Sequence, residues 1–332
     1  MNRIFYYILV LLVLLSALLW FLARDHDRTF DRGLTDFAVQ ETGRLERIIM
    51  EEGDKRLELK KKNGKWILNG IFETREEAVE QFLQTLQRIR VKSPSPVSLR
   101  EELLAGFSNS SVKVLLCTGR RSKIFFVHEH DLSNEAYMMM ENSDQPFAVD
   151  IYGYRGSVYN LFVVDEGYWR PNTLFSADPS DIAFVRVEFS GEPAHSFQLE
   201  PAGRNNFELT RLSSGEKIES LNDSIVAVFL SNFYFIPFQR YANEEERQKA
   251  DSLRNARPEY KITLNAENGY FRDVKLFRVT LSADPQTGER QTDPFMLYGL
   301  VNNDEDMIIV RYTDVDLILR RADYFLRRED SP

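Results

Sequence analysis

The segment RLELKKKNGKWILN, residues 56–69, decides the fold of the first part of the chain. Apolar and polar side chains alternate on both sides of Asn63-Gly64, a dipeptide that strongly favours a two-residue β-hairpin turn. A third alternating run precedes this segment, at residues 45–50. We therefore expect three consecutive antiparallel strands at the start of the domain.

The hydrophobic period changes after these strands. Apolar residues recur at helical spacing over residues 74–90, and Thr74 with Glu77 forms a capping-box pattern at the start. A short helix and four further strands are expected at residues 99–105, 112–117, 123–127, 136–140 and 147–151. The pattern predicts an α+β lobe, in which helices pack on a mixed antiparallel sheet, over residues 34–165.

The second half of the chain repeats this order. Three strands and a helix are expected at residues 182–189, 196–199, 207–210 and 221–233. In a superposition of the halves, Val228 falls on Phe82 and, further along, Met307 falls on Phe147. Two explanations stay open: generic patterning of two α+β domains, or an internal duplication that gives similar lobes at residues 34–165 and 182–326.

Residues 4–23, IFYYILVLLVLLSALLWFLA, contain no charged side chain. A helix of about 20 apolar residues spans the roughly 30 Å hydrocarbon core of a bilayer. A cleaved signal peptide normally has a shorter apolar segment followed by small residues, whereas Trp20 and Phe21 stand at that place. We expect an uncleaved transmembrane anchor over residues 1–28, in contact with the lipid bilayer through residues 4–23.

The charge balance and the cysteine content exclude several classes of partner and site. The chain has 42 Lys and Arg against 51 Asp and Glu, a formal net charge of −9. This balance argues against nucleic-acid binding, because affinity for phosphate backbones comes mainly from basic side chains. The single cysteine, Cys117, excludes an intrachain disulfide and a cysteine-based zinc cluster.

The most compact cluster of metal-ligand residue types is His128-Glu129-His130. In a strand both histidines project to the same face, and two imidazoles can hold zinc if a third ligand converges. None of the usual zinc-hydrolase spacings accompanies them, so His128 and His130 are weak metal candidates and no cofactor is expected. The sequence also lacks serine-elbow, phosphate-loop and dinucleotide motifs, so no catalytic residue is assigned.

Aromatic and guanidinium groups gather in two nearby segments. Tyr152, Tyr154 and Arg155 lie in a glycine-containing loop, and Trp169-Arg170 follows shortly after. These residue types dominate recognition hot spots, so the five side chains are candidate ligand-binding residues for a glycan or peptide. The structural alternative is that they form the loop and plug that connect the two lobes.

Four segments resemble a known bacterial family. They are DFAV at residues 36–39, KWILN at 65–69, YGYRG at 152–156 and WRPNTLF at 169–175. In this order behind an N-terminal anchor, they resemble the family called domain of unknown function 4340. The resemblance implies a single-pass protein of the bacterial inner membrane whose body lies in the periplasm. Some similar proteins are associated with ABC-type export or gliding-motility components, and the family has no established catalytic residues to transfer.

Three functions are therefore compared. The anchor and the missing catalytic motifs favour a non-enzymatic scaffold or accessory subunit of an envelope complex, with an ABC-type transporter as one expected partner. The alternative is an extracytoplasmic binding module for a glycan, a peptide or a small envelope ligand. A hydrolase that uses an unrecognised pair of carboxylates or histidines comes third, since carboxylates are abundant.

Overall fold

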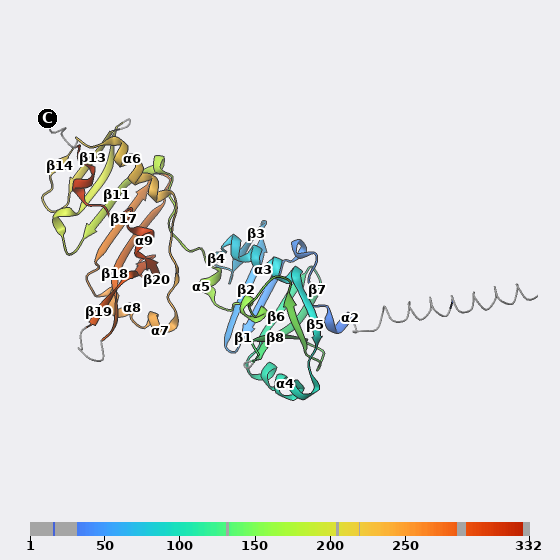
Figure 1. Ribbon diagram of the computed structural model, residues 1–332. Helices are drawn as coiled ribbons and strands as arrows, with labels where there is room; N and C mark the ends of the chain where they lie inside the picture. Colours follow the sequence, from blue (N-terminus) through green and yellow to red (C-terminus); the bar gives the residue numbers. More distant parts are fainter. Residues whose placement is uncertain are drawn as a thin grey trace, which may run out of the picture. The chain divides into compact units, whose positions relative to one another are not determined.

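The computed structural model describes residues 16, 32–130, 133–203, 206–218, 220–283 and 290–327. The chain divides into two compact units between Arg170 and Pro171, and each unit is built on one nine-stranded sheet (Figure 1). Except for Ser16, the expected membrane span at residues 4–23 lies outside the described residues. Within the described ranges, no helix is long and apolar enough to cross a bilayer.

The expected α+β class is wrong, because large antiparallel sheets dominate both units and the helices are short additions to them. Much of the second sheet is formed by two long strands, β18 (Phe271–Ala283) and β19 (Arg290–Val301). Neither strand was predicted from the sequence. β19 contains Pro294 and Gly299, residue types that normally weaken a strand interior and hide it from pattern reading.

The first sheet consists of antiparallel pairs throughout. Its spatial order is β4 (Phe72–Glu73), β3 (Lys65–Leu68), β2 (Lys55–Lys62), β1 (Arg47–Glu52), β6 (Val112–Thr118), β7 (Arg121–His130), β8 (Glu135–Met140), β9 (Phe147–Ile151) and β5 (Ile89–Pro94). The β2–β3 hairpin is confirmed: Asn63 and Gly64 have φ of 50° and 86°, and Lys62 pairs with Lys65 across the turn.

The second sheet has the same strand order as the first. It runs β14 (Lys217–Ile218), β13 (Asn206–Arg211), β12 (Phe197–Gly203), β11 (Ile182–Phe189), β17 (Tyr260–Ala266), β18, β19, β20 (Asp306–Arg311) and β16 (Arg240–Tyr241). A separate two-stranded ribbon pairs β10 (Thr173–Phe175) with β15 (Ile236–Pro237). In both sheets a four-strand meander and a second four-strand meander meet at their first strands, β1 with β6 and β11 with β17.

Short helices, including 3-10 turns labelled η, accompany each sheet. Those of the first unit are α2 (Arg32–Thr35), η1 (Thr42–Arg44), α3 (Glu76–Arg88), η2 (Val97–Leu99), α4 (Arg100–Asn109), η3 (Val158–Leu161) and α5 (Glu166–Trp169). Those of the second are η4 (Pro179–Asp181), η5 (Pro193–His195), α6 (Asp223–Ser231), η6 (Asn232–Tyr234), α7 (Glu244–Arg247), α8 (Ala250–Arg254), α9 (Tyr312–Val315) and η7 (Ala322–Phe325). Figure 1 shows α3 and α6 on their respective sheets.

The main core of each unit lies between one face of its sheet and its long helix. In the first unit α3 contributes Phe82 and Leu86, which pack with sheet residues such as Phe125. In the second unit α6 contributes Phe229. Full burial of such a side chain contributes about 1.5–3 kcal/mol, so these cores hold the helices in place.

α3 and α6 begin with the same contact. The backbone N–H of Arg75, just before α3, donates to the carbonyl oxygen of Trp169 at 2.8 Å. The N–H of Asn222, just before α6, donates to the carbonyl oxygen of Phe325, also at 2.8 Å. Because 222 − 75 = 147, residues of α6 match residues of α3 that lie 147 positions earlier. The sequence superposition of Val228 on Phe82 is therefore one residue off, and Phe229 is the true counterpart.

The same one-residue error occurs in β20. Ile308 and Val310 are fully buried in the main core of the second unit, as Phe147 is in the first. Met307, which the sequence superposition placed on Phe147, belongs to a separate cluster together with Ile309. Side chains alternate between the faces of a strand, so a shift of one residue moves every side chain to the other face.

The start of α3 also differs from the expected capping box. Arg75 is the capping residue, and its side chain makes no cap hydrogen bond. Thr74 instead donates its hydroxyl to the carbonyl oxygen of Trp66 at 3.1 Å, which fastens the chain after β4 to β3. α3 ends at Arg88 because the chain continues directly into β5.

Gly299 of β19 lies directly opposite Ile308 of β20. A Cβ added to Gly299 would lie 2.7 Å from Cγ1 of the buried Ile308, closer than two carbon atoms can pack. We expect Gly299→Ala to lower the free energy of unfolding of the second unit by about 1–3 kcal/mol, measured by denaturant titration. The exposed Gly191→Ala, with nothing within 4 Å of the new Cβ, should change it by less than about 0.5 kcal/mol. Equal effects of the two variants would contradict this.

Candidate functional site

Trp169 is fully buried in the core of the first unit. Its indole Nε1 donates to the carbonyl oxygen of Val163 at 2.8 Å, and its ring packs edge-on against Phe82 with centroids 5.5 Å apart. The indole therefore presents no face to a ligand. Its position agrees with the structural alternative considered for this segment.

Arg170 fastens α5 to the edge of the sheet. Its guanidinium lies 4.1 Å from the ring centroid of Phe72 in β4, and its Nη1 is 3.7 Å from Oε1 of Glu166. Glu166 also accepts a hydrogen bond from the Asn69 side chain at 2.9 Å. Only 11% of the Arg170 side chain is exposed, so these contacts hold it against β4.

Tyr152, Tyr154 and Arg155 lie in an exposed turn after β9. The Tyr152 ring is 85% exposed, with the Arg90 guanidinium 5.5 Å from its centroid. The hydroxyl of Tyr154 lies over Gly156, where a Cβ would come within 2.6 Å of it. Glycine at position 156 is therefore required for this ring position.

The five predicted ligand-binding residues do not form one site. The turn with Tyr152 follows β9, which pairs with the edge strand β5, whereas Arg170 contacts the opposite edge strand, β4. Seven strands lie between these two edge strands in the order of the sheet. The structure thus divides the predicted residues between an exposed turn at one edge and a packed corner at the other.

His128 and His130 project toward α4, on the same face of β7. Nδ1 of His128 is 2.8 Å from the carbonyl oxygen of Ser110, and the ring lies so close to Gly106 that a Cβ there would be 2.2 Å from Nε2. His130 hydrogen-bonds with the Ser133 hydroxyl and with Glu102 of α4, at 3.0 and 3.2 Å. Both histidines therefore hold α4 against the sheet. The described part of the chain contains no group of three or more metal-ligand side chains.

A groove of about 250 Å³ lies between α3 and the corner formed by β3 and β4. Its lining combines three apolar side chains, three acidic ones and one basic one, together with Gly64 and Thr74: Trp66, Val79, Leu83, Glu73, Glu76, Glu80 and Lys65. This groove was not predicted from the sequence. The acidic residues of α3 have the pattern of an ordinary solvated helix face, and only the fold shows that Trp66 lies beside them.

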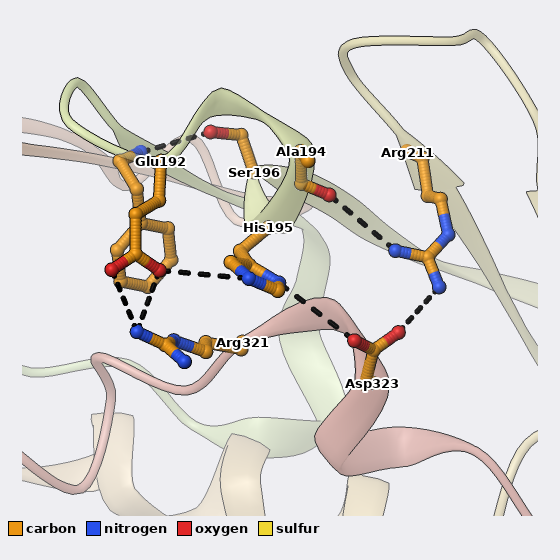
Figure 2. A network of polar contacts seen from close by, with 8 residues as sticks. Glu192, Ala194, His195, Ser196, Arg211, Arg321 and Asp323 are labelled. Atoms are coloured by element: carbon orange, nitrogen blue, oxygen red, sulfur yellow. Dashed lines mark hydrogen bonds and ion pairs between the residues drawn. The ribbon is translucent and has the colours of Figure 1, made fainter.

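Figure 2 shows a second polar cluster, in the other unit, which joins η5 to η7 and β13. Nε2 of His195 is 3.5 Å from Glu192, and its Nδ1 is 3.7 Å from Asp323. Arg321 pairs with Glu192, and Arg211 pairs with Asp323. Each of the two carboxylates is thus paired with an arginine, and the cluster ties η7 to η5 and to β13.

No family model, curated protein or solved structure matches this chain. The choice among the candidate surfaces therefore rests on their geometry and chemistry.

Truncation to alanine should lower the free energy of unfolding strongly at Trp169 and hardly at all at Tyr152. We expect Trp169→Ala to destabilise the first unit by about 3–5 kcal/mol, because it removes a large core side chain and leaves a cavity. Tyr152→Ala, at an exposed position, should change the free energy of unfolding by less than about 0.5 kcal/mol. Denaturant unfolding followed by circular dichroism measures both. A stable, fully folded Trp169→Ala variant would refute the core assignment.

Asp323 should make the stability of the second unit depend on acidic pH. The hydrogen bond from Arg211 lowers the pKa of the Asp323 carboxyl below its ordinary value. A lowered folded-state pKa gives stability that is present above the unfolded-state pKa, about 3.9, and is lost as pH falls through the folded-state pKa. Arg211→Gln should therefore lose less stability than the wild type between about pH 5 and pH 2.5.

Denaturant titrations at each pH test this expectation. The exposed Arg257→Gln removes the same charge elsewhere in the unit and should keep the wild-type pH dependence. A pH dependence that is identical for wild type and Arg211→Gln would show that the Arg211–Asp323 pair does not contribute.

Proposed function

We propose that the chain is a membrane-tethered, non-enzymatic scaffold or accessory subunit of a bacterial envelope complex. The apolar residues 4–23 would anchor it in the inner membrane, and the two sheet units would lie in the periplasm. The resemblance to the domain of unknown function 4340 family supports this topology and suggests an ABC-type transporter as a partner. The proposal assigns no catalytic residue.

The main structural support for this proposal is the outer face of α6. α3 and α6 occupy equivalent places, and their exposed positions coincide when the numbering is shifted by 147. On α3 these positions hold Glu76, Glu77, Glu80, Gln81, Gln84, Gln87 and Arg88. On α6 and the residues after it they hold Asp223, Ser224, Ala227, Val228, Ser231, Tyr234 and Phe235.

Three of the substituted positions expose large apolar side chains. Val228, Tyr234 and Phe235 are 60%, 67% and 58% exposed. The first unit builds the same helix with a polar outer face, so the fold does not require apolar groups there. Exposed apolar patches of this kind mark interaction surfaces, and aromatic residues are enriched in the centres of protein interfaces.

The chemistry of this face fits a polypeptide better than a lipid surface. α6 reads DSIVAVFLS, and Asp223 is its only charged residue. A helix that lies on an anionic membrane normally carries Lys and Arg beside its apolar face, which attract the lipid headgroups. We therefore infer that the occupant is an apolar periplasmic segment of an integral membrane subunit of the complex.

The alternative function, a binding module for an envelope ligand, is supported by a different observation. The groove beside α3 combines an aromatic wall with carboxylates, which is a lining suited to a ligand and not only to solvent. Such a site is compatible with a scaffold, since it can bind part of the same partner.

A photo-crosslinking amino acid at position 228 of the full-length chain tests the scaffold proposal. In intact cells we expect a crosslink from position 228 to one integral membrane subunit of a transport complex, identified by mass spectrometry. Position 81, the counterpart of 228 on α3, is the matched control and should give no such product. Crosslinks from position 228 only to lipid, to a second copy or within the same chain would refute the assigned occupant.

A further inference from the structure

We propose that the groove between α3 and the β3–β4 corner binds an alkylammonium group, namely a lysine side chain presented by a partner protein. The inference concerns the first unit alone. It does not depend on the docking face of α6.

The groove has the size and the wall that one lysine side chain needs. Its volume of about 250 Å³ is below the roughly 300–1,000 Å³ of pockets for drug-sized ligands. Trp66, Val79 and Leu83 form an apolar wall along it. The four methylene groups of lysine pack on such a surface while the ammonium reaches a polar rim.

The rim has the charge that complements an ammonium. Glu76 and Glu80 stand one turn apart on α3, where two like charges disfavour the helix slightly. The Gln84 amide donates to Glu80 at 3.3 Å without neutralising it. On the other side, Lys65 places its ammonium 3.0 Å from Glu73. The ammonium of Lys65 thus already binds one carboxylate of the rim, Glu73. The ammonium of an incoming lysine can pair with the other two, Glu76 and Glu80.

Trp66 adds an aromatic surface that attracts cations. Nζ of Lys61, its cross-strand neighbour, lies 6.0 Å from the centroid of its ring. Tryptophan gives the strongest cation–π attraction among the aromatic side chains. The indole therefore contributes both apolar contact and electrostatic attraction to an alkylammonium group.

The second unit shows that the fold does not need this lining. Glu80 corresponds to Ala227, and Asp223, the counterpart of Glu76, is 3.5 Å from Arg327. Leu68 of β3 pairs with β2, and Leu209 of β13 pairs with the equivalent strand β12, so the two leucines occupy matching positions. Phe207, two residues before Leu209, therefore matches Trp66, two residues before Leu68. The same architecture forms with alanine in place of Glu80 and phenylalanine in place of Trp66. We therefore assign Glu80 and Trp66 a role in binding a ligand and not in folding.

Fluorine NMR on the full-length protein in neutral-lipid nanodiscs tests the proposal. The chain has three tryptophans, at positions 20, 66 and 169, so labelling with 5-fluorotryptophan gives few signals, and Trp66→Phe assigns the relevant one. The probe is the capped peptide Ala-Ala-Lys-Ala-Ala. We expect a saturable shift of the Trp66 signal alone. The same peptide with norleucine in place of lysine should cause none, because it keeps the stem and lacks the charge.

Charge variants separate the groove from general electrostatic attraction. Glu80→Gln should weaken peptide binding about threefold, and Glu76→Gln combined with Glu80→Gln about tenfold. Glu77→Gln, an exposed acid of the same helix outside the groove lining, should leave binding unchanged. Equal weakening by Glu77→Gln and Glu80→Gln, or equal shifts by the lysine and norleucine peptides, would overturn the proposal.

Cadaverine identifies the source of the ammonium group. Weaker binding of this free diamine than of the peptide supports a lysine on a protein. Binding of cadaverine as tight as that of the peptide would refute the assignment to a protein partner. Failure of the α6 crosslink leaves all these outcomes unaffected, because the two tests probe different units.

Discussion

Each unit is closed by a contact between the start of its long helix and its last large buried aromatic residue. Trp169 accepts a hydrogen bond from the backbone before α3 and packs edge-on against Phe82. Phe325 does the same before α6, with its ring 4.9 Å from that of Phe229. The contact adds a hydrogen bond at the start of the helix to the burial of Phe82 and Phe229 in the two cores. The contact fixes which helix residues face the core and which face solvent.

Once the inner face is fixed, the outer face is free to vary, since its residues do little for the fold. The two helices demonstrate this freedom with the same set of exposed positions. Gln81 of α3 and Val228 of α6 occupy matching exposed positions, yet the first has an amide side chain and the second an aliphatic one. Differences between the outer faces therefore report on what each unit meets in solution or in a complex.

Individual strands and hairpins could be predicted from the sequence, but the pairing of distant strands within the sheets could not. Alternation around Asn63-Gly64 identifies a hairpin because turn chemistry and side-chain period are local properties. The pairing of β1 with β6 and of β5 with β9 joins distant segments, and no local signal encodes it. The error in the expected α+β class has the same origin, since β18 and β19 gain their stability from neighbours that the pattern does not show.

The candidate site shows a similar division. Trp169 was a sensible ligand-binding candidate by residue type, but burial depends on Phe82, which lies 87 residues earlier in the chain (169 − 82). Conversely, Glu76 and Glu80 looked like an ordinary solvated face until the fold placed Trp66 next to them.

An acidic side chain on a helix surface has little specificity in water, because solvent screens it and the side chain moves freely. Beside an indole and two aliphatic side chains, the same carboxylate attracts cations that also carry an apolar stem. The specificity of the groove therefore arises from tertiary contact between α3 and β3, and residue type alone cannot reveal it.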